Sequence, residues 1–104
     1  MIITTSENIP GKEIYNILGI ARGSTVRARN LERDIFAAFK NVVGGEIEEY
    51  TRLQADAREQ ALERMIADAQ KLDADAVINL RFSTSLIMQG ASEILAYGTA
   101  VRLS

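Results

Sequence analysis

The longest amphipathic stretch of the chain runs from Glu46 to Asp73 and predicts one long helix. It contains no Gly or Pro and is rich in residue types that lose little conformational freedom in a helix. Its apolar residues recur at helical spacing and share one side: Tyr50, Leu53, Ala57, Ala61, Leu62, Met65, Ala69 and Leu72. We therefore expect the rest of the chain to pack on this helix and to run directly from it into a strand.

Two features of the apolar side of this helix indicate what it contacts. Ala57 and Ala61 lie one turn apart and are small enough to let another backbone approach closely. Three polar residues interrupt the same side: Gln54, Arg58 and Asp68. Either these side chains reach past the edge of the core, or this side also meets a neighbouring subunit that supplies polar partners.

A second, shorter helix is predicted upstream of the long one. Asn30 is a good N-cap, and the apolar residues behind it recur at helical spacing: Leu31, Ile35, Phe39 and Val42. Gly44 and Gly45 end this helix, because Gly tolerates the left-handed conformation at a helix C-terminus.

Four strands are predicted around the helices. Ile2–Thr5 is short and rich in β-branched residues, and the turn signal of Pro10 and Gly11 follows it. The stretch 13–29 is a second β region, which we expect residues 23–25 to interrupt as a bulge or hairpin. The stretches 75–88 and 94–103 alternate and are joined by a hairpin loop at 89–92.

Alternation assigns faces to the two C-terminal strands. Ile78, Leu80 and Phe82 are expected on one face of the first of them, with Asn79 and Arg81 on the other. In the second, one face carries Leu95, Tyr97, Thr99, Val101 and Leu103. The other carries only small residues, Ala96, Gly98 and Ala100, which permits close packing of a helix or a partner backbone.

The order of elements is therefore β-β-α-α-β-β, an α+β class in which two helices pack on one face of a mixed or antiparallel sheet. The 104 residues suffice for a single domain covering 1–104. The helix that ends near Leu72 continues into a strand without a Gly, so we expect its end to lack a left-handed glycine.

Composition removes several function classes. There is no Cys and no His, so disulfides, thiolate nucleophiles and the usual catalytic triad are excluded. A net charge of −2 argues against nucleic acid as a partner. No apolar run is long enough to span a membrane and no secretion signal is visible, so we expect a cytoplasmic protein.

A small set of residues could bind a ligand. Arg22, near Arg27 and Arg29, belongs either to a solvated strand edge or to a site for an anion or carboxylate between subunits. Asn79 and Arg81 lie on a strand that starts where the long helix ends and could line a pocket. The candidate ligand-binding residues are Arg22, Arg58, Asn79 and Arg81.

Asp73 and Asp75 could bind a hard cation or act as an acid/base pair. The alternative, a helix terminus with solvated carboxylates, is favoured, since two ligands do not make a complete cation site. We therefore predict no catalytic residue and no specific metal site. The sequence pattern does not indicate which cofactor, if any, the protein binds.

A set of short motifs is spread over the whole chain: Thr4-Thr5, 18–23, Val42-Val43-Gly44-Gly45, Tyr50, 57–61, Ala69, 72–78 and 97–101. In these motifs and their order the chain resembles the YbjQ-type family of small bacterial and archaeal proteins. This resemblance implies a dodecin-like β-β-α-α-β-β subunit that assembles as a ring-like homopentamer with short strands shared between neighbours. The resemblance also implies heavy-metal binding. Soft metals prefer thiolate and imidazole ligands, and this chain contains neither Cys nor His, so its composition does not support that role.

Three hypotheses about function follow. The first is a non-enzymatic homo-oligomer, expected to be a pentamer, that binds a small ligand between subunits. The second is a metal-ion-binding protein that uses carboxylates such as Asp73 and Asp75. The third, an acid/base enzyme that uses carboxylates with Arg, has the least support, so we expect no enzymatic activity.

Overall fold

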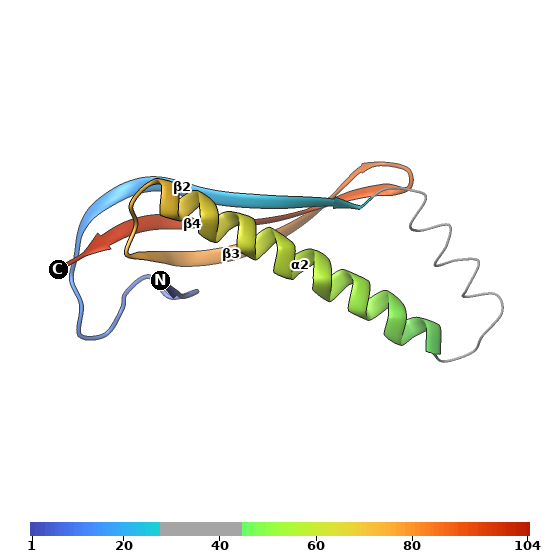
Figure 1. Cartoon of the computed structure of the whole chain (residues 1–104), viewed down its shortest axis with the longest axis horizontal. Coiled ribbons are helices and arrows are strands. Elements are labelled where there is room, and N and C mark those ends of the chain that lie inside the picture. The colour runs from blue at the N-terminus through green and yellow to red at the C-terminus, as the bar shows by residue number, and fades with distance from the viewer. Residues whose placement is uncertain (28–44) are drawn as a thin grey trace.

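The computed structural model describes residues 1–27 and 45–104, with the side chains of residues 45–54 outside the description. The elements in these ranges are β1 (Ile2–Ile3), β2 (Ile14–Arg27), α2 (Gly45–Lys71), β3 (Ala76–Met88) and β4 (Ala91–Leu103). The strands form one sheet in the order β1-β3-β4-β2, and α2 packs on one face of it (Figure 1). The predicted α+β class with a mixed sheet is thus confirmed. The predicted helix at Asn30 to Val43 lies outside the described residues.

Strand β4 is the centre of the sheet. It pairs antiparallel with β2 on one side and with β3 on the other, while β1 pairs in parallel with β3. The hairpin between β3 and β4 turns at Gln89 and Gly90, where Gly90 has a φ of 81°. The predicted C-terminal hairpin is therefore confirmed, and the first strand is shorter than the predicted Ile2–Thr5.

The close contact between α2 and β2 explains the small residues of both elements. Ala57, Ala61, Met65 and Ala69 are fully buried on the side of α2 that faces the sheet. A Cβ atom on Gly23 would lie 2.2 Å from the backbone nitrogen of Met65. The predicted interruption at residues 23–25 is therefore wrong: β2 is continuous there, and Gly23 serves to let the helix backbone approach.

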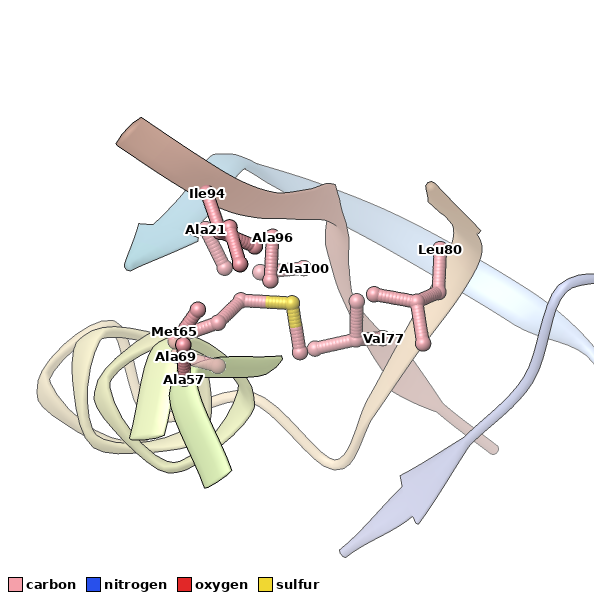
Figure 2. Packing of buried hydrophobic residues seen from close by; sticks show 10 residues of the cluster. Ala21, Ala57, Met65, Ala69, Val77, Leu80, Ile94, Ala96 and Ala100 are labelled. Carbon is pink, nitrogen blue, oxygen red and sulfur yellow. The ribbon is translucent and has the colours of Figure 1, made fainter. Parts of the chain in front are cut away.

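The small-residue face of β4 packs as predicted. Ala96, Gly98 and Ala100 are buried on the helix side of the sheet. Figure 2 shows the Met65 side chain extending from α2 past Ala96 and Ala100 toward Val77 of β3. Burying one such side chain stabilises the fold by about 1.5–3 kcal/mol.

A β-bulge at Asn79 changes the faces predicted for β3. The pairing with β4 shifts between Ile78 and Arg81, and Asn79 has a φ of 54°. Because the extra residue reverses the alternation, Ile78 joins the apolar cluster away from α2, whereas Leu80 joins the cluster under α2. The expectation that Ile78 and Leu80 share one face is therefore wrong.

The C-terminus of α2 ends in a left-handed residue that is not glycine. Asp73 has a φ of 61°. The Ala74 N–H donates to the Ala69 carbonyl at 3.2 Å and the Asp73 N–H to the Gln70 carbonyl at 3.0 Å, the two bonds of a Schellman motif. The helix end has no left-handed glycine, as expected, but it does have a left-handed cap. Asp73 adopts this conformation in place of a glycine.

The molecule is elongated. Its principal extents are 56 × 25 × 17 Å and its radius of gyration is 17.0 Å, against about 13 Å for a compact chain of similar length. The β3–β4 hairpin projects from the body while α2 diverges from it toward the helix N-terminus (Figure 1). The outer half of β3 is consequently left without a helix over it among the described residues.

Candidate functional site

Three side chains from three strands form one row on the sheet face opposite α2. Tyr97 of β4 is the register partner of both Arg22 of β2 and Arg81 of β3. Register partners of an antiparallel pair point to the same face and have Cα atoms about 5 Å apart, so the two arginine Cα atoms are about 10 Å apart. We call Arg22, Tyr97 and Arg81 the cross-strand row.

The burial of neighbouring residues shows which face the row occupies. Ala21 and Gly23 on either side of Arg22 are buried toward α2, as are Ala96 and Gly98 on either side of Tyr97. Arg22 and Arg81 are exposed, and Tyr97 retains 38% of its surface. The row therefore presents two cations and one aromatic ring to the outside of this single chain.

The backbone under Arg22 is fixed by α2. The Arg22 N–H donates to Oδ2 of Asp68 at 3.0 Å, so the strand is held by a helix side chain while the guanidinium lies on the opposite face. Asp68, one of the polar residues on the apolar side of α2, therefore finds its hydrogen-bond partner within the same chain, at the Arg22 N–H of β2. The position of Gln54 lies outside the described side chains.

The other end of the row is fixed by the bulge. Nη1 of Arg81 donates to the carbonyl oxygens of Thr5 at 3.0 Å and Leu80 at 2.7 Å. The Asn79 N–H donates to the Ser6 carbonyl and the Leu80 N–H to the Thr4 carbonyl, each at 3.0 Å. Arg81 therefore ties the segment after β1 to β3, and its side chain is held in place while it stays exposed.

The four predicted ligand-binding residues do not all meet. Arg22 and Arg81 lie in one row, and Asn79 lies beside it in the bulge. Arg58 is exposed on α2, on the other side of the sheet. Sequence reasoning missed Tyr97 as a site residue because only the strand register, which the bulge at Asn79 sets, brings it between the two arginines.

The rows on either side supply no counter-charge. One contains Ile20, Thr99 and Ile78, and the other contains Ser24, Leu95 and Ser83. The nearest acidic residue along β4 is Glu93, two rows from Tyr97 on the same face. The centre of this face is therefore positively charged and otherwise apolar or hydroxylic.

Of the two residues predicted as an alternative metal site, Asp75 is tied into the fold through its carboxylate and Asp73 through its backbone carbonyl. Oδ2 of Asp75 accepts the Leu103 N–H at 2.8 Å, and the Asp73 carbonyl accepts Nη1 of Arg102 at 2.8 Å. The pKa of Arg102 is raised above its usual value. The main cause is the hydrogen bond to Tyr15, and the charges of Asp75 and Asp73 add to it. A cation beside these acids would face that guanidinium, and the described residues hold no group of three or more potential metal ligands.

Comparison with known proteins identifies close relatives and a solved structure of the same fold. The model of the YbjQ family, described as "Putative heavy-metal-binding", matches residues 1–104. A UPF0145 protein of Archaeoglobus fulgidus is 60% identical over 99% of this chain and 95% of its own length. One from Thermotoga maritima is 57% identical over 99% and 97%.

A crystal structure of a DUF74-family protein of unknown function from Pediococcus pentosaceus matches with a TM-score of 0.66. It is 17% identical and covers 100% of this chain and 98% of its own, so it supports the fold alone. No helix in the ranges 1–27 and 45–104 combines the length and apolarity needed to cross a membrane.

Proposed function

We propose, from the premise that this chain belongs to the YbjQ family, that it works as a non-enzymatic homo-oligomer that holds a small ligand between subunits. Five copies is the number we expect. The observation that carries the proposal is the presence of two separate exposed apolar patches on a chain of this size.

The first patch lies on the sheet face away from α2. It contains Ile17, Ile20, Val26 and Tyr97, of which Ile20 is 62% exposed, and we call it the sheet-face patch. The second lies on the projecting half of β3. It contains Phe82 and Leu86 on the sheet face that α2 covers elsewhere, with Ile87 and Met88 beyond them at the hairpin; Leu86 is 75% exposed, and we call these four residues the β3 patch.

The separation of the two patches favours a ring. A two-fold dimer has one self-complementary interface, and Ile20 and Leu86 lie on opposite faces of the sheet, so one such interface would leave one of the two patches in water. A head-to-tail contact of the sheet-face patch with the next copy's β3 patch covers both, and it closes when the rotation between copies divides a full turn. The outer edge of β2 and the edge of β3 beyond β1 carry no strand partner among the described residues, so they could pair in the same contact.

The test uses one lysine substitution in each patch. Native mass spectrometry of the wild-type protein is expected to show an oligomer larger than a dimer. Ile20→Lys and Leu86→Lys should each be monomeric, because each places a charge in a contact that is buried only in the assembly. Gln60→Lys, on the exposed side of α2, is the matched control and should assemble normally. A monomeric wild-type protein would overturn the proposal.

Mixing the two variants tests the head-to-tail arrangement. Ile20→Lys keeps an intact β3 patch and Leu86→Lys keeps an intact sheet-face patch, so one productive contact remains between them. The mixture is expected to give a one-to-one heterodimer that grows no further. Heterodimers absent from the mixture, with each variant still folded by circular dichroism, would contradict a contact between these two patches.

The ligand would lie at the cross-strand row, which the next subunit covers in this arrangement. Arg22 and Arg81 are the residues we propose to contact it, with Tyr97 beneath. Metal binding through Asp73 and Asp75 is the alternative function. It predicts heat on titration with zinc, copper, calcium or magnesium, whereas the hydrogen bond of the Asp75 carboxylate with the Leu103 N–H favours a structural role for Asp75.

A further inference from the structure

We propose that the cross-strand row binds an oxyanion carried on a flat, unsaturated ring, such as an aromatic carboxylate or a nucleoside monophosphate. The inference rests on the proposed function, because it uses the covering of the row by a second copy. It specifies the chemistry of the ligand, which the assembly alone leaves open.

The first step is the charge that assembly would bury. The row shares its sheet face with Ile20 and Val26, so a neighbour that covers the sheet-face patch also covers Arg22. A guanidinium removed from water requires an anionic or hydrogen-bonding partner, because an unpaired buried charge is strongly unfavourable.

The second step is the neutrality of the surface that would cover it. Residues 83–92, which contain the projecting end of the β3–β4 hairpin, read Ser-Thr-Ser-Leu-Ile-Met-Gln-Gly-Ala-Ser and include no acid. Glu93, the register partner of Ser85, is the first acid beyond this stretch, so the apolar residues of the β3 patch themselves bring no counter-charge. A small anion from solution supplies what the protein surfaces lack.

The third step is the shape of the site. Guanidinium groups bind carboxylate and phosphate oxygens with two parallel hydrogen bonds. Tyr97 lies between the arginine positions and offers an exposed aromatic ring on which a flat ligand body can stack. Nη1 of Arg81 is held by Thr5 and Leu80, so this arginine is positioned before the ligand arrives.

Calorimetric titration of the full chain with AMP, benzoate, inorganic phosphate and adenosine tests the proposal. AMP and benzoate cover the two sources of the proposed chemistry, phosphate lacks the ring and adenosine lacks the anion. At least one of AMP and benzoate is expected to bind more tightly than phosphate and adenosine. Arg22→Gln should weaken that binding about tenfold or more, because one charge-assisted pair is lost. Lys71→Gln, which removes an exposed cation elsewhere, should leave it unchanged.

Tyr97→Leu separates stacking from charge. It should reduce the affinity for the ring-bearing anion to that for phosphate, because the ring is lost while both arginines remain. Equal affinity of Tyr97→Leu and wild type would overturn the role of the ring. Arg22→Gln keeps its backbone N–H bond to Asp68, so loss of folding is not expected in that variant.

Native mass spectrometry of the same samples distinguishes the two proposals. An intact oligomer that binds neither AMP nor benzoate would overturn this inference and leave the assembly standing. A monomer would overturn both. Glu93→Gln completes the set: an assembly that dissociates on this substitution, with no probe bound by the wild type, would show that a protein carboxylate is the counter-ion.

Discussion

At the scale of single residues, two non-glycine positions with positive φ determine how the elements join. Asp73 at 61° turns the chain out of α2, and Asn79 at 54° creates the bulge in β3. Such conformations cost a side-chain-bearing residue about 1–2 kcal/mol, which the surrounding hydrogen bonds must offset. At Asp73 these are the two bonds of the Schellman motif, and at Asn79 they are the bonds to the segment after β1.

The strain at Asp73 predicts a stabilising substitution. Asp73→Gly should raise the free energy of unfolding by about 0.5–1 kcal/mol, because glycine adopts this φ without a steric cost. The hydrogen bond from Arg102 is retained, since it goes to the backbone carbonyl of residue 73. Urea denaturation followed by circular dichroism measures the change.

Glu59→Gly provides the matched comparison for Asp73→Gly. Glu59 is exposed in the interior of α2, where glycine should lower the free energy of unfolding by about 0.5 kcal/mol. Changes of the same sign in both variants would show that the conformation of residue 73 is not the cause.

At the scale of elements, the sequence predicts that a backbone approaches α2 closely, but it does not identify that backbone as β2. The alanines at 57 and 61 indicated that a backbone would approach, but only the three-dimensional pairing shows that the backbone is that of Gly23. The same glycine suggested a break in the strand, because glycine both ends strands and admits close neighbours. The assignment of β3 residues to the two faces of the sheet fails at the bulge, because an Asn at position 79 is compatible with regular alternation and with a bulge.

Enlarging Ala61 tests this contact. Ala61→Leu should lower the free energy of unfolding by about 1–3 kcal/mol, because the added atoms have no space between α2 and β2. Gln60→Leu adds a comparable side chain at the neighbouring, exposed position and should change stability by about 0.5 kcal/mol or less. Equal melting curves and oligomer masses for Ala61→Leu and the wild type would place residue 61 outside the contact.

At the scale of the whole molecule, the site could be predicted only in part. Arg22 and Arg81 were selected from the sequence as separate charges, and the register through Tyr97 is what makes them neighbours. Arg58 was selected for its place on the apolar side of the helix, yet it is exposed and away from the row. The bulge at Asn79 shifts the register of β3 by one residue, and the sequence pattern alone does not reveal that shift.

Chelation provides a prediction at this scale. At the helix–strand junction the Asp75 carboxylate accepts the Leu103 N–H and the charges of Asp75 and Asp73 act on Arg102, and the described ranges contain no group of three potential metal ligands. We therefore expect treatment with EDTA to leave both the oligomer mass and the melting temperature unchanged. A fall in either, restored by adding back one divalent cation, would favour the metal-binding alternative.

The central position of β4 has a consequence for the order in which the chain is made. β4 leaves the ribosome after the three other strands that the structure describes, yet both β2 and β3 pair with it. The apolar residues of β2 must therefore wait, without a strand partner, for more than sixty residues of further synthesis. The sheet therefore cannot be completed before residues 91–103 have been synthesised, and stalled chains lacking residues 91–104 should be cut rapidly by proteases that leave the finished protein intact.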